Sequence, residues 1–169
     1  MRVNPIKSKS GGILLPNLFQ LAYVTTDMDK AQQVLGAQFG ITKWQNPPTF
    51  ETKPGSTIRF ANAYVGDIMV QLFQVLSGED GSIWHNWQPE PGQLMRFHHI
   101  GHMLFDDEEW QHVLKEIDRL KFPVVMRGNH KNFEDFVYID ARETLGHYVE
   151  YIYCKPEGQV FFDELRKSE

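Results

Sequence analysis

Residues Phe19–Asp27 read FQLAYVTTD, and residues His98–Asp106 read HHIGHMLFD. Each stretch has a polar side chain at its second position, Gln20 or His99, within an apolar run that ends at an aspartate. The second positions are 79 residues apart (99 − 20), and so are the two aspartates (106 − 27). A strand-like run followed by a helix-capping aspartate, occurring twice at one offset, indicates an internal repeat.

The far ends of the two copies match in the same way. Gln71 lies in the apolar run Val70–Phe73, and Glu150 lies in the corresponding run Val149–Ile152, again 79 residues later (150 − 71). Gln20 precedes Gln71 by 51 residues, and His99 precedes Glu150 by 51 (71 − 20 and 150 − 99). Each copy therefore has one candidate metal ligand near its start and one near its end.

The pattern of apolar residues and turns predicts a βαβββ module in each copy and an α+β fold class. A helix should begin after the N-cap Asp27 and end at Gly40, and a second should begin after Asp106 or Asp107. The predicted strands cover 18–25, 50–51, 56–64, 67–76, 97–105, 123–126, 136–140 and 148–153. The predicted parts are a polar tail at 1–16, a first module at 17–76, a linker at 77–95, a second module at 96–155 and a C-terminal tail or short helix at 156–169, with the two modules forming one domain.

Alternation along strands predicts which residues share a face. The four candidate ligands should lie on one face, and helices should cover the other. The same alternation puts His98 and His102 on the helix side with Ile100, where we expect structural roles. An apolar substrate pocket should surround the ligands, lined by Met69, Phe73, Phe97, Met103, Tyr148 and Ile152.

Composition excludes several classes of protein. The chain has 169 residues, 41% of them hydrophobic, and a net charge of −5. This balance offers no basic surface for nucleic acid, and no apolar run is long enough for a membrane span. The single cysteine, Cys154, cannot form an internal disulfide, which fits a cytoplasmic location.

Four stretches in this order resemble the vicinal oxygen chelate superfamily, which includes glyoxalase I, methylmalonyl-CoA epimerase, extradiol dioxygenases and bleomycin-resistance proteins. They are 20–31, 66–73, 97–101 and 140–150, and the resemblance covers roughly residues 17–155. It implies tandem βαβββ modules that form a U-shaped mixed-sheet cup around a divalent metal. Carried over by position, the implied metal ligands are Gln20, Gln71, His99 and Glu150.

The donor set of the implied site suits Zn²⁺, Ni²⁺, Co²⁺ or Mn²⁺, because it combines an imidazole, a carboxylate and two amides. Only Glu150 among them is anionic. The resemblance implies a lyase or isomerase in which Glu150 is both a ligand and a catalytic base that moves a proton next to a carbonyl. Glu51 is a weaker candidate for a separate catalytic base. Family members commonly form homodimers, and we expect one here.

Departures from the family patterns leave the substrate open. An extradiol dioxygenase needs a histidine where this chain has Gln20, and glyoxalase I usually has Glu where this chain has Gln71. Methylmalonyl-CoA epimerase has Gln there but His in place of Gln20. Gln20, Gln71 and His99, each taken alone, could be hydrogen-bonded core residues. Glu150 fits that alternative less well, because an unpaired buried carboxylate is costly. The alternative function is a metal-free protein that binds a small molecule, as bleomycin-resistance proteins do.

Overall fold

The elements of the two copies follow one another in the predicted order. A computed structural model describes residues 17–51, 55–78 and 81–167. The first copy contains β1 (Leu18–Thr25), α1 (Met28–Phe39), β2 (Phe50–Glu51), β3 (Thr57–Val65) and β4 (Ile68–Ser77). A short 3-10 helix, η1 (His85–Trp87), follows. The second copy contains β5 (Met95–Leu104), α2 (Asp107–Arg119), β6 (Val124–His130), β7 (Glu134–Ala141), α3 (Arg142–Leu145), β8 (His147–Cys154) and α4 (Pro156–Lys167).

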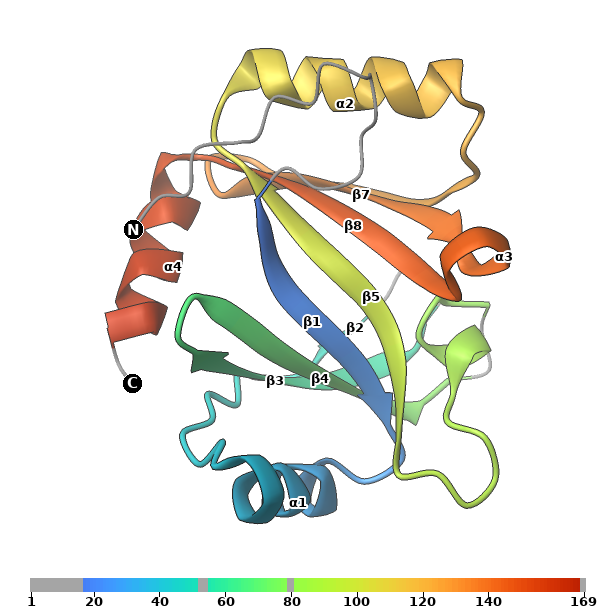
Figure 1. Ribbon diagram of the computed structural model, residues 1–169, viewed down its shortest axis with the longest axis vertical. Helices are drawn as coiled ribbons and strands as arrows, with labels where there is room; N and C mark the ends of the chain where they lie inside the picture. The colour runs from blue at the N-terminus through green and yellow to red at the C-terminus, as the bar shows by residue number, and fades with distance from the viewer. Residues whose placement is uncertain (1–16, 52–54, 79–80, 168–169) are drawn as a thin grey trace. The chain divides into compact units, whose positions relative to one another are not determined.

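The strands form an eight-stranded mixed sheet in the order β2-β3-β4-β1-β5-β8-β7-β6. The pairing of β1 with β4 is parallel, whereas β3 with β4 and β7 with β8 are antiparallel. The predicted α+β fold class is therefore confirmed. The described chain falls into a first unit, residues 20–99, and a second unit, residues 17–19 and 100–167, and strands β1 and β5 contribute residues to both (Figure 1).

Helix α1 covers one face of the sheet in the first unit. It begins after Asp27, whose side chain accepts a hydrogen bond from the Lys30 backbone amide, and it ends at Gly40 in the left-handed conformation, both as predicted. The core under the helix consists of Met28, Ala31, Ala61 and Leu72, with Tyr23, Leu35, Trp44, Leu94 and Met95 packed around it. We call this side of the first unit the helix face.

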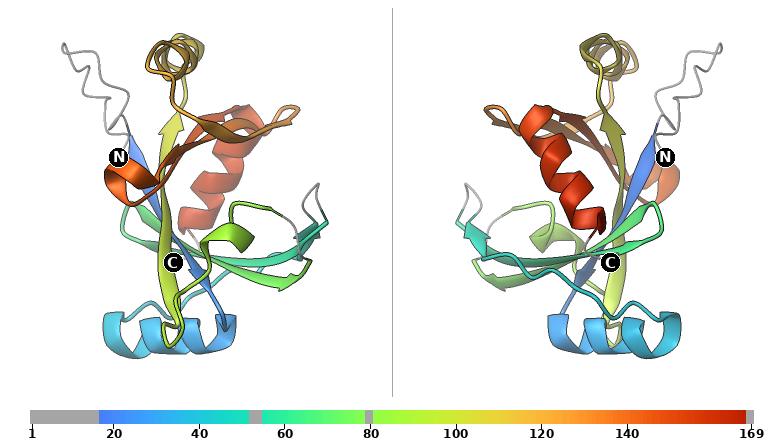
Figure 2. Two further views of the ribbon diagram at one scale, coloured as in Figure 1. Left: turned by 90° about the vertical axis from the view of Figure 1, so that its right-hand side faces the viewer. Right: turned by 90° about the vertical axis from the view of Figure 1, so that its left-hand side faces the viewer.

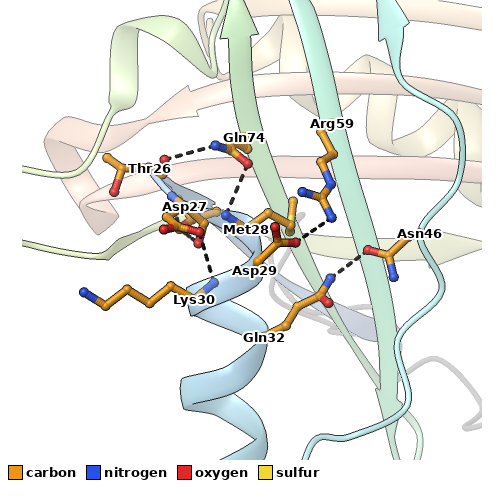
Figure 3. A network of polar contacts seen from close by, with 10 residues as sticks. Thr26, Asp27, Met28, Asp29, Lys30, Gln32, Asn46, Arg59 and Gln74 are labelled. Carbon is orange, nitrogen blue, oxygen red and sulfur yellow. Dashed lines mark hydrogen bonds and ion pairs between the residues drawn. The ribbon is translucent and has the colours of Figure 1, made fainter.

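A polar network fixes the start of α1 to the neighbouring strands (Figure 3). Gln74 on β4 accepts a hydrogen bond from the Met28 backbone amide at 3.2 Å and donates one to the Thr26 carbonyl at 3.0 Å. Arg59 on β3 forms an ion pair with Asp29 at 2.8 Å. These contacts satisfy polar groups at the helix N-terminus and set the position of α1 on the sheet.

The second unit has a core between α2 and strands β7 and β8. Its members are Leu104, Trp110, Val113, Ile117, Val137, Ile139, Ala141, Val149 and Tyr151. Asp106 caps α2 by accepting hydrogen bonds from the Glu108 and Glu109 amides. Helix α4 lies on the side of β7 and β8 opposite α2, as Figures 1 and 2 show. It packs Phe162 against Phe19 and Phe133.

Some elements differ from the predicted ones. Strand β6 reaches His130, beyond the predicted end at Met126, because it pairs with β7 as far as Glu134. The short helix α3 was not predicted; it follows Asp140, which accepts a hydrogen bond from the Arg142 amide, and ends at the left-handed Gly146. The predicted tail at 1–16 lies outside the described residues. Within the described part of the chain, no helix is long and apolar enough to cross a membrane.

Candidate functional site

Two of the predicted metal ligands are hydrogen-bonded to each other in the first unit. Gln20 on β1 donates from Nε2 to Oε1 of Gln71 on β4 at 2.8 Å. The parallel register pairs Ala22 with Gln71, so the two glutamines lie on the same face, opposite Leu72 and α1. We call this the glutamine face; it carries Gln20, Asn62, Gln71 and Phe73.

The third predicted ligand, His99, joins this pair. Its Nε2 lies 3.3 Å from Oε1 of Gln20, and the imidazole is fully buried. Its ring centroid is 6.0 Å from that of Phe73 on the same face. The structure therefore brings Gln20, Gln71 and His99 together, in a row of amide, amide and imidazole.

The neighbouring His98 corrects the prediction made from alternation. Its Nδ1 is 2.7 Å from Nδ1 of His99, and its ring contacts Phe73 on the glutamine face, not the helix face. Both histidine side chains thus point to the glutamine face. The alternation of side chains between the two faces of β5 is therefore interrupted at His98 and His99. As a consequence Phe97, predicted for the pocket, lies on the helix face with its ring 5.3 Å from Tyr23.

An aromatic cluster borders the histidine pair. Trp84 packs on Phe73 with ring centroids 5.3 Å apart and is nearly parallel to His98 at 6.4 Å. Phe50 and Phe60 extend the cluster. Trp84 lies in the predicted linker and is buried, so this linker residue is part of the packing around the candidate site.

Asn62 is a site residue that the sequence reasoning missed. It lies directly opposite Gln71 in the antiparallel pairing of β3 and β4 and is 4% exposed. Its Oδ1 has no hydrogen-bond partner among the described residues. Cross-strand register brings it to the glutamine face, and no spacing rule in a single sequence reveals that register.

Glu150, the fourth predicted ligand, is buried in the second unit. It lies on β8 opposite Tyr138, and these two define the Glu150 face of that unit, since the intervening Val149 and Tyr151 pack into the core under α2. Burial raises the pKa of Glu150 to about 8, against a hydrogen bond from Tyr138 that lowers it. A carboxyl group held this way is protonated at neutral pH unless a cation compensates its charge.

A second acidic group accompanies Glu150. Burial, followed by the charge of Glu150, raises the pKa of Glu134 to about 7, although His130 contacts it at 3.2 Å and lowers the value. Glu134 lies at the start of β7. The second unit therefore contains two carboxyl groups with raised pKa values, and such groups are frequent at functional sites.

The remaining predicted residues are placed as follows. Met69 and Phe73 are buried on the glutamine face, and Tyr148 and Ile152 are buried on the Glu150 face; Met103 is also buried. Their joint lining of one pocket stays a prediction. Glu51 is exposed on β2, and its neighbour Phe50 contacts Phe60 and Trp84 on the glutamine side. Alternation therefore turns Glu51 to the opposite side.

The donor atoms of the first unit fit a divalent metal. Two ligands bound at about 2.1 Å to one ion stand about 3.0–3.4 Å apart. The Gln20 Oε1 to His99 Nε2 distance of 3.3 Å falls in this range. Among the described residues, no three His, Cys, Asp or Glu side chains form a metal-binding group. A metal held by these residues would therefore need amide donors. Whether Glu150 meets the other three residues stays a prediction.

Comparisons with known proteins reveal similarity only in structure. No family model matches the sequence, and no curated protein matches it. Methylmalonyl-CoA epimerase from Mycobacterium tuberculosis matches with a TM-score of 0.61 and 13% identity, over 87% of this chain and 93% of that one. A hypothetical protein from Bacillus halodurans C-125 matches at 0.55 and 17%, over 82% and 94%.

A third match carries a bound molecule. It is a variant of Streptomyces coelicolor methylmalonyl-CoA epimerase in complex with 2-nitronate-propionyl-CoA, with a TM-score of 0.53 and 12% identity, over 82% of this chain and 96% of that one. At these identities the similarity concerns the fold alone. It shows that this chain has the fold of methylmalonyl-CoA epimerase, which is the fold of the vicinal oxygen chelate superfamily.

Proposed function

We propose that the chain is a metal-dependent isomerase or lyase that moves a proton on the carbon next to a substrate carbonyl. The observation that carries the proposal is the row formed by Gln71, Gln20 and His99, with Gln20 Oε1 and His99 Nε2 at the spacing of two ligands of one ion. A divalent ion held by Gln20, Gln71, His99 and Glu150 would supply Lewis acidity toward a bound carbonyl oxygen.

Glu150 is the residue that would hold and move the proton. Its pKa of about 8 in the metal-free protein lies close to neutral pH, the range in which a carboxyl group can both accept and return a proton. Tyr138 is hydrogen-bonded to it and holds it in place on the Glu150 face. Burial excludes water from the carboxyl group and so limits competing exchange.

The substrate class is a small molecule with a carbonyl and a second oxygen nearby. One epimerase of the same fold was solved with methylmalonyl-CoA, and another with a nitronate analogue of an acyl-CoA. An acyl thioester with an acidic α-hydrogen is therefore the first compound to test. The departure at Gln20 from the epimerase pattern means that other carbonyl compounds must be tested beside it.

The experiment has two parts. Purified protein is titrated with Zn²⁺, Ni²⁺, Co²⁺ and Mn²⁺ by calorimetry, and hydrogen exchange of candidate substrates is followed by NMR in deuterium oxide. We expect one metal per chain, weaker binding in His99→Ala, and a smaller loss in Gln20→Ala, because water can replace an amide oxygen. Absence of metal binding in the wild-type protein contradicts the proposal.

A second candidate function is metal-free binding of a small molecule. It is favoured by the hydrogen bond that Gln20 donates to Gln71, because this bond engages Oε1 of Gln71, a predicted ligand atom. Its signature is a protein that binds no divalent metal, and whose small-molecule binding survives Glu150→Gln.

The same proposal includes a homodimer. Strands β2 and β6 are the two edges of the sheet, and β6 exposes Val124 and Val125. Exposed edge strands of this kind have unpaired backbone groups, which pairing with a second subunit would cover. Light scattering at micromolar concentration tests it, and a monomer there contradicts it.

A cytoplasmic location is also part of the proposal. Burial and the charges of Glu134 and Asp163 raise the pKa of the Cys154 thiol to about 12, so the thiol is unreactive, as expected of a structural cysteine. Cell fractionation tests the location.

A further inference from the structure

Asn62 is a buried amide that the pairing of the strands does not need. It lies within β3 between the buried Ala61 and Ala63, and it is 4% exposed. Its backbone N–H and carbonyl are both bonded to Gln45, at 2.9 and 2.8 Å. Asparagine is depleted in strands, and burying an amide is unfavourable unless it is hydrogen-bonded. The fold alone therefore does not account for asparagine at this position.

The hydrogen bonds of the Asn62 side chain are incomplete. Its Oδ1 is buried and accepts no hydrogen bond from the described part of the chain. A buried oxygen without a donor lowers stability, and most such oxygens in proteins have a partner. An oxygen of this kind points to a donor that turns toward it when a ligand binds nearby.

The side-chain donor directly opposite Asn62 in the sheet belongs to Gln71. The two residues are partners in the antiparallel pairing of β3 and β4. Because the backbone groups of Asn62 point toward Gln45, its pair with Gln71 is of the non-hydrogen-bonded type. In such pairs the Cα atoms are only about 4.5 Å apart and the side chains lie closest. The amide nitrogen of Gln71 can therefore reach Asn62 Oδ1 by a side-chain rotation.

The two ends of the Gln71 amide have different surroundings. Its Oε1 accepts a hydrogen bond from Nε2 of Gln20 at 2.8 Å, whereas its Nε2 does not donate to Asn62. An amide binds a metal through its oxygen, and this polarises the carbonyl and makes the N–H groups stronger donors. Ligands in metal sites are usually held by further hydrogen bonds of this kind. Asn62 is placed to supply one to Gln71.

We propose that Asn62 is a positioning residue for Gln71. Its Oδ1 accepts a hydrogen bond from Nε2 of Gln71 when Oε1 of Gln71 binds the metal, and this bond holds the amide in the coordinating orientation. The proposal rests on the proposed metal site, because Gln71 turns to Asn62 only as a ligand. Asn62 itself contacts neither the metal nor the substrate.

The first experiment compares melting temperatures in the presence of a chelator. Asn62→Leu removes the amide but keeps its approximate size, and we expect it to melt at or above the wild-type temperature, because Oδ1 has no bond to lose. Gln74→Leu is the matched control: this amide on β4 is bonded at both ends, to Met28 and Thr26, so its loss should lower the melting temperature. Melting of Asn62→Leu below the wild type overturns the proposal, because Oδ1 would then have a partner without metal.

The second experiment measures Zn²⁺ affinity by calorimetry. We expect Asn62→Leu to bind Zn²⁺ about tenfold more weakly than the wild type, as when the outer partner of a metal ligand is removed. Gln74→Leu should stay within about twofold of the wild type. If Asn62→Leu and the wild type bind equally, the proposal for Asn62 fails and the metal site stands. If the wild type binds none of the four metals, both fail.

The third experiment tests whether the effect passes through Gln71. In a Gln71→Ala background the donor is absent, so adding Asn62→Leu should change the remaining Zn²⁺ affinity by less than about twofold. In a Gln20→Ala background the donor is present, and Asn62→Leu should still weaken binding about tenfold. An effect of Asn62→Leu that persists without the Gln71 side chain contradicts the proposal, since Asn62 would then act on the metal without Gln71.

Discussion

The third and fourth strands of the two copies occupy the same place in the module but have different chemistry. In the first unit Asn62 faces Gln71, which is bound to Gln20 by an amide hydrogen bond at 2.8 Å. In the second unit Tyr138 faces Glu150, whose pKa burial raises to about 8. The amide pair is neutral at every pH, whereas the buried carboxyl group needs either a proton or a cation.

This difference divides the proposed ligand set into two amides, whose charge does not change with pH, and one carboxyl group, whose charge does. The hydrogen bond between Gln20 and Gln71 sets the geometry of the amides, and Glu150 supplies the charge that would attract a dication. Changes to Glu150 should therefore have larger effects on metal binding than changes to either glutamine.

The largest effect is expected for Glu150→Gln. This variant removes the only negative charge of the proposed ligand set, so we expect metal affinity to fall roughly 100-fold or more, and proton exchange with the substrate to stop. Calorimetry and NMR exchange measure the two effects. At pH 6 the protonated carboxyl group and the amide are similar, so both proteins should melt alike. Metal affinity within a few-fold of the wild type would remove Glu150 from the site.

The pH dependence of stability tests the same difference between the neutral glutamine pair and the titrating Glu150. The folded pKa of Glu150, about 8, lies above its ordinary value of 4.5, so the folded state binds more protons between these values. In the presence of a chelator, the contribution of Glu150 to the free energy of unfolding should be most favourable below about pH 5. It should fall as the pH rises to about 8. Glu134 adds to this slope up to about pH 7.

Urea unfolding at several pH values measures this slope. Glu150→Gln should reduce it but not abolish it, because Glu134 still titrates. Saturating metal should also reduce it, because the cation stabilises the carboxylate. A wild-type protein whose stability is the same at pH 5 and pH 8 would contradict the raised pKa of Glu150.

A gain in metal affinity is expected when a negative charge is added to the glutamine pair. Gln71→Glu adds a second carboxylate to the proposed ligand set, while Gln20 can still donate to it. We expect metal affinity to rise about tenfold. Gln33→Glu, on the exposed surface of α1, is the matched control for net charge. Equal effects of the two variants would mean that Gln71 is not a ligand.

The sequence was sufficient for the repeat, the boundaries of α1 and the faces of Gln20, Gln71 and Glu150. These follow from capping residues and strand alternation, which are local. It failed at His98 and Phe97, because alternation shifts within β5 where two adjacent histidines point to one side. At this pair His98 is hydrogen-bonded to the Ile83 carbonyl, a contact across 15 residues that local patterns do not encode.

Other parts of the site also depend on tertiary contacts. Asn62 and Tyr138 reach the candidate ligands through antiparallel register, which a one-residue slip would reverse. The pKa values of Glu134 and Glu150 arise from burial, which becomes known only when the strands are packed. A single sequence therefore predicts which residues are candidate ligands, but it does not predict Asn62 and Tyr138 beside them.

The smallest effect is expected at Glu51, the predicted second base. Phe50 is held on the glutamine side by Phe60 and Trp84, and this contact turns Glu51 to the exposed opposite side. Glu51→Gln should therefore leave metal affinity and proton exchange within about twofold of the wild type, as surface substitutions generally do. Both are measured as for Glu150→Gln. If exchange falls tenfold while metal affinity is unchanged, Glu51 moves a proton, and β2 must then reorient when substrate binds.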